Sequence, residues 1–432
     1  MGGVDRISAL PDEIKISILS RLKVKYAIRT SALARSWRHL WTHLPCLRLG
    51  LHPYQDRLGG NTASVTTDWI ERAHHLVSSL RGPLDLFELI HRFTSDQAPL
   101  IQRLLHLLLQ KGGVEKLYLK FLYHPQLVHL PPFHSLKVLQ LCKCHVLLPN
   151  GFQGFRSLTT LELDHVQISS DHLNFLIHTS NNLTTFLGSE FLVSEDPLSI
   201  TITSPLLRHL TFEIDDSIEK VSVSSAPCLE KVEIMDCILN RTDSSSKKLA
   251  PVALGLLVSV ATVSSLNLES NILRSLSLVT LPIDFSFSQL RSLSFDFYID
   301  TMNERMCDAF FWLLRSMPFL EELNLLYEYS GQINRVVILM EELLGKESDG
   351  ISCLNQTLKS VTISTSDIMN AINFGKFFLL NAKVLKLMKF HCLKWSYVEP
   401  GIIEELQKAE VTPSNAKVVI FCDNEGVTIN VK

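Results

Sequence analysis

Cysteine and histidine side chains stand close together at Cys142, Cys144 and His145, in the order Cys-Lys-Cys-His. Thiolates and imidazoles are the usual ligands of zinc, but a structural zinc site needs four ligands, commonly supplied as two spaced pairs. No matching second pair stands at such a spacing in the sequence. We therefore predict no metal site here, and Cys144 has another role in the repeat pattern described below.

The sequence also lacks the common motifs of catalysis and nucleotide binding. It contains no phosphate-binding glycine-rich loop, no Gly-x-Ser-x-Gly motif and no His-Glu-x-x-His motif. The sixteen histidines are scattered, and the adjacent pair His74-His75 falls in a predicted helix, where solvent exposure or packing is the ordinary role. We predict that the protein is not an enzyme and needs no cofactor, so its function should be binding.

The most distinctive segment is residues 5–49, which begins with a strong helix signal. Pro11 suits the first turn of a helix, because the amide hydrogen that proline lacks is not needed there. Asp12 and Glu13 place negative charge at the positive end of the helix dipole. Apolar residues then recur at positions 10, 14, 18, 19 and 22, which is the spacing of one helix face.

A second helical run is predicted from about Tyr26, with Leu33, Trp37, Leu40 and Trp41 three to four residues apart. Short helices of this kind need packing to persist. A segment of this length cannot bury a large core, so we expect part of its apolar face to bind a partner.

Residues 1–50 are also basic. Nine Lys and Arg against three Asp and Glu give this segment a net charge of +6, so the other residues carry −9 to reach the total of −3. A basic helical segment favours an acidic partner, either DNA bound through a helix-turn-helix or an acidic protein surface. The basic residues are spread around both predicted helices, which favours a protein partner. DNA binding and a plain helical cap on the next domain remain alternatives.

From residue 114 onward, an apolar triad of the form L-x-x-L-x-L recurs. The first copies start 22 to 25 residues apart, within the period of leucine-rich repeats. Leu183/Phe186 is a weaker copy, and Val263/Leu266/Leu268 is a possible extra one. The full triads are Val114/Leu117/Leu119, Leu136/Leu139/Leu141, Leu158/Leu161/Leu163, Leu207/Leu210/Phe212, Leu229/Val232/Ile234, Leu273/Leu276/Leu278, Leu290/Leu293/Phe295, Leu320/Leu323/Leu325, Leu358/Val361/Ile363 and Ala382/Leu385/Leu387.

The residues after the triads agree in part with this assignment. The leucine-rich pattern has Asn or Cys at its ninth position, and Cys144 and Cys237 match it, whereas Val166 and Asp215 do not. The repeats are therefore degenerate. Because one repeat cannot bury its own apolar face, we predict an α/β fold: a small N-terminal helical domain followed by a stacked solenoid, with parallel strands on one face and helices or irregular turns on the other.

Helical patterns outside the triads complete the predicted organisation. They cover 68–80, 96–111 (stopped by Gly112-Gly113), 303–317 and 333–344. The predicted domains are the helical domain at 1–50, a helical coupling or capping segment at 51–113, degenerate repeats at 114–370, and a C-terminal region with the last repeats at 371–432.

Side chains that alternate with the triad residues should face outward and are the candidate target contacts. They show no dominant chemistry, and for any single one a solvated strand position is favoured over a target contact. The candidates are Tyr118, Lys120, Gln140, Glu162, Asp164, His209, Glu213, Lys231, Glu233, Asp296 and Glu322.

The N-terminal segment resembles an F-box, the helical motif by which substrate receptors join Skp–cullin–F-box ubiquitin ligases. The matching residues are Leu10-Pro11-Asp12-Glu13 and the run from Arg29-Thr30-Ser31 to Trp41, followed by Leu44-Pro45. Residues 377–387 and 416–421 resemble the FBD region. With the repeats, the whole chain is similar to plant F-box/leucine-rich-repeat proteins; Arg35-Ser36 and Cys46 depart mildly from the commoner residues.

This resemblance implies a non-catalytic substrate receptor that binds a Skp-family adaptor, through it a cullin, and an unknown target protein. A scaffold that never assembles with a cullin is the alternative. The resemblance assigns the adaptor-binding face, formed or supported by Leu10, Pro11, Ile14, Ile18, Leu19, Leu22, Leu33, Trp37 and Trp41.

Composition sets the remaining expectations. With 46% apolar and 20% charged residues, the chain is not a disordered scaffold. Nine scattered cysteines and the absence of a signal-peptide pattern predict the cytoplasm or the nucleus. Residues 249–268 lack charge over the length of a membrane span, but Pro251, Gly255 and five polar residues in the second half argue against one. We expect neither membrane nor nucleic-acid partners.

Overall fold

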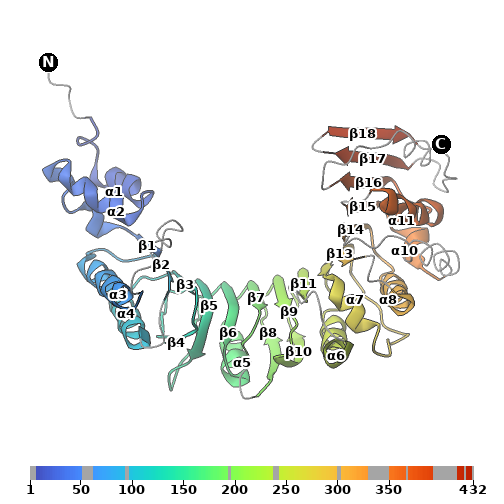
Figure 1. The fold of residues 1–432 in the computed structure, drawn as a ribbon, viewed down its shortest axis with the longest axis horizontal. Coiled ribbons are helices and arrows are strands. Elements are labelled where there is room, and N and C mark those ends of the chain that lie inside the picture. The colour runs from blue at the N-terminus through green and yellow to red at the C-terminus, as the bar shows by residue number, and fades with distance from the viewer. Residues whose placement is uncertain are drawn as a thin grey trace. The chain divides into compact units, whose positions relative to one another are not determined.

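The computed structural model of the protein describes residues 6–50, 62–92, 97–192, 196–236, 243–298, 303–328, 350–365, 368–392, 416–422 and 425–430. The chain forms two compact units, Met1–Leu207 with Ser225–Pro227, and Arg208–Ser224 with Cys228–Lys432. Each unit contains parallel strands connected by helices and loops (Figure 1). The predicted fold class, a helical N-terminal part followed by a repeat array with parallel strands, is confirmed.

The N-terminal part begins with two helices, α1 (Asp12–Ser20) and α2 (Val24–Arg29). The second helical run is not continuous as predicted, because three 3-10 turns follow α2: η1 (Thr30–Ala32), η2 (Arg35–Trp37) and η3 (Leu40–His43). Ala34 interrupts them with an extended backbone, φ −159° and ψ 161°. A 3-10 turn also brings residues three apart to one side, so the apolar spacing did not distinguish the two structures.

A small core holds these elements together. It consists of Leu19, Ala27, Trp37, Leu40 and Leu44, with Ile16, Ala34 and Trp41 packed against it. The indole nitrogen of Trp37 donates a hydrogen bond of 2.9 Å to the Ser8 hydroxyl, which fixes the ring on the residues ahead of α1.

The first unit carries one parallel sheet whose strands follow the chain in order, with β4 paired beside β5. Its strands are β1 (Cys46–Gly50), β2 (Leu86–His91), β3 (Lys116–Phe121), β4 (Gln126–His129), β5 (Val138–Leu147), β6 (Thr160–Gln167) and β7 (Thr185–Ser189). Its helices are α3 (Thr62–Ser79), α4 (Ala98–Lys111) and α5 (Ser170–Thr179). Strand β8 (Leu198–Thr203) lies along α5, where the Asn174 amide donates to the Ser199 carbonyl and accepts from the Thr201 amide.

The second unit repeats this arrangement in its own parallel run, which an antiparallel last strand closes. Its strands are β9 (His209–Glu213), β10 (Ile218–Ser225), β11 (Lys231–Met235), β12 (Ser265–Leu268), β13 (Ser292–Tyr298), β14 (Glu322–Glu328), β15 (Ser360–Thr365), β16 (Leu387–Cys392), β17 (Lys417–Cys422) and β18 (Glu425–Asn430). Its helices are α6 (Asp243–Ser259), α7 (Ser270–Leu276), α8 (Glu304–Arg315), α10 (Ser352–Gln356) and α11 (Ile368–Asn381).

Most predicted triads supply the buried side chains of these strands. Leu117 and Leu119 in β3, for example, are buried at 0% and 1% exposure. The possible extra copy is confirmed, because β12 contains Leu266 and Leu268 and pairs in parallel with β11 and β13.

Two triads were assigned wrongly. Leu273 and Leu276 belong to helix α7, because a spacing of three also puts two leucines on one helix face. In the last triad the register is shifted: Met388 and Phe390, not Leu387, pair with Val361 and Ile363 and are buried.

The parallel sheet also begins earlier than the triads predicted. Strands β1 and β2 precede residue 114 and bury Leu47 and Leu49, and Phe87 and Leu89. Each of these strands has its own copy of the triad, Leu44/Leu47/Leu49 for β1 and Leu84/Phe87/Leu89 for β2. The predicted domain boundaries at 50, 113 and 370 remain predictions.

The predicted helices are present where the structure describes them. Helix α4 ends at Gly112, which has φ +69°, and α8 is capped by Asn303, whose side chain accepts a hydrogen bond of 3.0 Å from the Met306 amide. The pattern at 333–344 lies outside the described residues. The uncharged stretch 249–268 is divided between α6 and β12, and no described helix is long and apolar enough to cross a membrane.

Candidate interaction surfaces

The N-terminal helices expose a set of large apolar side chains beside their small core. Ile14 and Ile18 lie one turn apart on α1, so they share a face, and they are 48% and 40% exposed. Leu22 follows the helix at 42%, and Leu33 is 71% exposed. We call Ile14, Ile18, Leu22 and Leu33 the exposed apolar set. Large apolar side chains exposed together are typical of a surface that binds another protein.

The nine residues predicted for the adaptor face divide between surface and core. Pro11 is exposed and Leu10 is half-buried, and both precede or begin α1. Leu19 and Trp37 are buried at 0% and 3%, and Trp41 packs on the same core. Leu19 and Trp37 therefore belong to the core of the N-terminal part and not to the exposed apolar set. Helical spacing cannot distinguish surface from core residues here, because it shows which residues share a side of the helix and not how deeply each side chain is buried.

Sequence reasoning missed the role of Lys15, a buried charged residue in α1. Its side chain is 4% exposed and its Nζ lies 3.2 Å from Oδ1 of Asp12. The ammonium group also lies 6.0 Å from the centre of the Trp37 ring. The spacing of Asp12 and Lys15, three residues apart on a helix, is the signal that could have revealed this pair.

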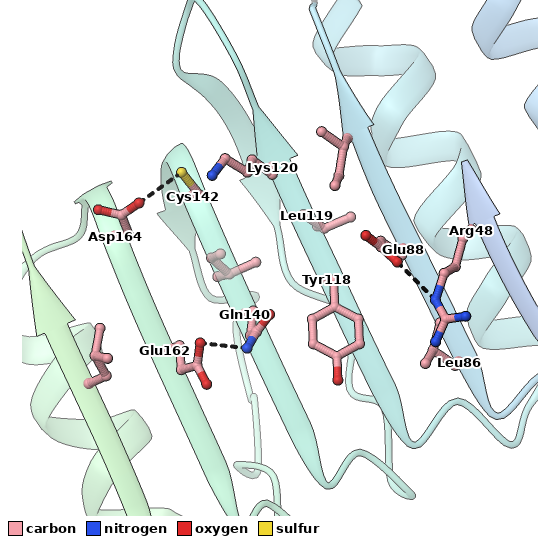
Figure 2. A pocket seen from close by; sticks show the side chains of 13 residues that line it. Arg48, Leu86, Glu88, Tyr118, Leu119, Lys120, Gln140, Cys142, Glu162 and Asp164 are labelled. Carbon is pink, nitrogen blue, oxygen red and sulfur yellow. Dashed lines mark hydrogen bonds and ion pairs between the residues drawn. The ribbon is translucent and has the colours of Figure 1, made fainter. Parts of the chain in front are cut away.

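A polar hollow lies on the outward face of the first unit's sheet (Figure 2). Its volume is about 330 Å³, and side chains of β1, β2, β3, β5, β6 and β7 line it, including the apolar Leu86, Ile90 and Leu187. The strand register forms one row from Arg48 through Glu88, Tyr118 and Gln140 to Glu162. A second row, two residues further along each strand, contains Lys120, Cys142 and Asp164.

Five of the predicted target contacts thus meet in one place: Tyr118, Lys120, Gln140, Glu162 and Asp164. Sequence reasoning missed Arg48, Glu88 and Cys142, because β1 and β2 were not recognised as part of the sheet and Cys142 was considered only as a metal ligand.

Hydrogen bonds connect neighbouring strands across the hollow. The Nε of Arg48 lies 3.1 Å from a carboxylate oxygen of Glu88. The Gln140 amide donates to Glu162, and the Cys142 thiol donates to Asp164 over 3.1 Å. These contacts fix the side chains laterally, so the hollow has a defined shape before any partner binds.

Asp164 is the most extensively hydrogen-bonded carboxylate of the hollow. Partial burial alone would raise its pKa, but hydrogen bonds from the Cys142 thiol, His165 and Ser189, with the nearby His165 charge, lower the pKa below its ordinary value. His165 also contacts Glu190 through its other ring nitrogen.

The backbone at this edge of the hollow is unusual. Lys143, His165 and Glu190 have positive φ angles of 56°, 52° and 46°. They follow Cys142, Asp164 and Ser189, which are aligned on adjacent strands. Left-handed backbone is uncommon for residues other than glycine. Here it recurs in three successive repeats, each time at the residue that directly follows the aligned positions Cys142, Asp164 and Ser189.

The cysteines near the hollow do not form a reactive or metal-binding group. Burial, the hydrogen bond to Asp164 and the Asp164 charge raise the pKa of Cys142 to about 12, so the thiol stays protonated at neutral pH. Burial also raises the pKa of Cys144, which lies inside the repeat core. Within the described parts of the chain, no three His, Cys, Asp or Glu side chains converge as metal ligands.

The other six predicted contacts belong to the second unit. His209, Lys231 and Glu322 are exposed, and Asp296 and Glu233 are half-buried. Glu233 lies 2.6 Å from the Lys231 ammonium. Glu213 was predicted to face outward, but it is 3% exposed. The alternation of buried and exposed residues breaks at the end of β9, as it does at Leu141 and Cys142 in β5.

Comparison with known proteins agrees with this organisation. The F-box domain model matches residues 7–49. The model described as "FBD-associated F-box protein At5g56370, LRR repeats" matches residues 101–324, more than half of the chain. The chain therefore belongs to the family of FBD-associated F-box proteins with leucine-rich repeats, and the predicted resemblance is confirmed.

Individual relatives come from Arabidopsis thaliana. The chain is 29% identical to F-box/FBD/LRR-repeat protein At1g13570 over 235 residues, 53% of each chain, so it spans about half the length of that relative. It is 24% identical to FBD-associated F-box protein At5g22730 over 97% of this chain and 95% of the relative. A stretch of 47 residues, 11% of this chain and 10% of the relative, is 51% identical to F-box/LRR-repeat protein At5g02910.

Proposed function

We propose that the protein is the substrate-recognition subunit of an SCF-type E3 ubiquitin ligase. Its F-box docks on a Skp-family adaptor, which connects it to a cullin, and its repeats bind a target protein. The observation that carries this proposal is the exposed apolar set, Ile14, Ile18, Leu22 and Leu33, standing on a separate buried core inside the residues that match the F-box model.

Physical chemistry favours a protein partner for this surface. Covering each exposed apolar side chain contributes up to about 1.5–3 kcal/mol, so a few of them suffice for stable docking. The net charge of +6 over residues 1–50 favours a partner surface that is acidic around the apolar contact.

In this proposal the chain itself catalyses no reaction. The repeats hold a target near a ubiquitin-charged enzyme, and the gain is a high effective concentration of the target's lysines. We expect the complex to act in the cytoplasm or the nucleus.

The proposal is tested by capture of a purified Skp-family adaptor on the immobilised full-length protein. The variant Ile14→Ser/Ile18→Ser/Leu22→Ser should reduce capture at least about tenfold, because docking then buries far less apolar surface. The control variant Ser17→Ala changes an exposed uncharged residue of α1 and should capture the adaptor like the wild type. Equal capture by the triple variant would refute the assigned face.

A second step separates a ligase subunit from a scaffold. Cullin added to the adaptor-bound protein should be retained on the wild-type protein and lost with the triple variant. Retention of the adaptor without any cullin would favour the scaffold.

A further inference from the structure

We propose that the polar hollow of the first unit binds an extended peptide segment of the target that carries an acidic and a basic side chain. The acidic side chain contacts Lys120, and the basic side chain contacts Glu162 and Asp164. This inference rests on the part of the proposed function in which the repeats bind a protein target.

The charges that remain uncompensated in the hollow carry this inference. Arg48 and Glu88 neutralise each other. Lys120 is exposed on β3 and pairs with no carboxylate or other acceptor in the described part of the chain. Glu162 accepts a hydrogen bond from the neutral Gln140 amide, and no cation pairs with it among the described residues.

The acidic end stays negative even with the histidine included. One imidazole, His165, serves both Asp164 and Glu190. An imidazole carries at most one positive charge, which cannot neutralise two carboxylates. The Nζ of the neighbouring Lys143 lies 3.5 Å from the Leu122 carbonyl, a neutral acceptor. The hollow is therefore positive at Lys120 and negative at Glu162 and Asp164.

The positive and negative ends are separated by the neutral side chains of Gln140 and Cys142. Lys120 lies on β3, Gln140 and Cys142 on β5, and the two carboxylates on β6 (Figure 2). Adjacent strands are about 4.8 Å apart, so the two strands that carry the opposite charges, β3 and β6, are roughly 10 Å apart. In a polyproline II segment, side chains three residues apart point the same way and are about 9 Å apart. A peptide with opposite charges three residues apart matches this distance.

The sheet itself determines how such a peptide must bind. Strands β3, β5 and β6 each pair on both sides, so an incoming segment cannot add to them as a new strand. Side chains must make the contacts, and the peptide must run across the strands. Asp164, which three donors hold in place, loses little side-chain entropy on binding.

The experiment selects dodecapeptides from a random phage-displayed library on the immobilised full-length protein. Peptides enriched on the wild type should share an acidic and a basic residue about three positions apart. The charge-swap variant Lys120→Glu/Glu162→Lys/Asp164→Asn, in which no carboxylate remains at the formerly acidic end, should enrich peptides with the two charges in the opposite order. The control variant Lys116→Glu changes an exposed lysine on the same strand, outside the hollow, and should return the wild-type pattern.

Several results would overturn the inference: no enrichment on the wild type, a consensus without paired opposite charges, or the same consensus on the swap variant. A milder variant, Lys120→Gln/Glu162→Gln, guards against misfolding of the charge swap. A synthetic peptide selected on the wild type should bind this milder variant about tenfold more weakly than the wild-type protein. Equal binding to the two proteins would also count against the inference.

Adaptor capture by the same preparations distinguishes this inference from the proposed function. If the protein captures the adaptor but selects no peptides with the expected charge pattern, only the inference about the hollow is refuted, and the proposed function stands. The peptide pattern on a protein that captures no adaptor would leave the hollow as a binding site outside any ligase.

Discussion

The Nδ1 atom of His165 lies 2.8 Å from Oδ1 of Asp164, its direct neighbour in the chain. Adjacent residues of a regular strand point to opposite faces, so this contact needs the left-handed backbone of His165, φ 52°. The turn directs the imidazole back to the outward face, where it also reaches Glu190 on the next repeat. The carboxylate that ends the hollow is thus held from its own chain and from both neighbouring strands.

The first prediction concerns pH and Asp164. Its folded-state pKa is lowered, so its contribution to stability is complete above the ordinary pKa of an unfolded aspartate and is lost as pH falls through the lower folded-state value. The stability difference between wild type and Asp164→Asn should therefore shrink as pH falls below about pH 4. Urea denaturation at several pH values measures it, and a difference that stays constant down to pH 3 would contradict the prediction.

The second prediction separates core from surface in the F-box. Leu19→Ala should cost about 2–5 kcal/mol, because it leaves a cavity beneath Trp37. Leu33→Ala should change stability by less than about 0.5 kcal/mol, because that side chain is 71% exposed. Chemical denaturation followed by tryptophan fluorescence measures both variants. Similar losses for the two would show that the burial of these residues is misassigned.

The third prediction concerns the buried Lys15. Its partner Asp12 is largely exposed, so the ion pair contributes little, while the buried ammonium group pays for its desolvation. Lys15→Met keeps the length of the side chain and should be neutral or stabilising. Lys15→Glu should be clearly destabilising, because it buries a negative charge close to Asp12. A large loss of stability in Lys15→Met, measured by thermal denaturation, would show that the ammonium group is needed.

The fourth prediction compares two glycines in the same loop. Both have positive φ, 75° at Gly151 and 83° at Gly154, so alanine strains the backbone at either position by about 1 kcal/mol. At Gly154 the new methyl group would also overlap the Thr179 side chain, whereas at Gly151 it meets no described atom within 4 Å. Gly154→Ala should therefore lower the melting temperature more than Gly151→Ala does, and equal shifts would remove the steric argument.

Much of the fold followed from the spacing of apolar residues. The triads found most strands because the inward residues of a parallel repeat sheet must be apolar, and Asn303 and Gly112 marked helix ends through their capping chemistry. Leu273 and Leu276 show the limit of this reasoning, since the same spacing of three suits a helix. Strand β1 was missed because its triad lies inside the segment assigned to the F-box.

The surfaces were harder to predict than the fold. The outward positions Tyr118, Lys120 and Glu162 were identified from alternation, but their meeting in one hollow depends on the register between strands. Sequence alone gives no such register, and it also cannot tell which outward charges neutralise each other. The pairing of Arg48 with Glu88, beside a Lys120 that pairs with no carboxylate among the described residues, became visible only in three dimensions.

Strand β1 ends the F-box match and is also the first strand of the repeat sheet. Backbone hydrogen bonds from Asp85 and Leu86 to the Pro45 carbonyl, and from Arg81 to the Thr42 carbonyl, connect the two parts directly. A shared strand of this kind makes a rigid connection between the F-box and the repeats, unlike a flexible linker. In the proposed ligase, the orientation of a bound target relative to the adaptor would then depend on the geometry of these few hydrogen-bonded residues. An insertion between residues 45 and 46 should change that orientation while both binding surfaces still bind their partners.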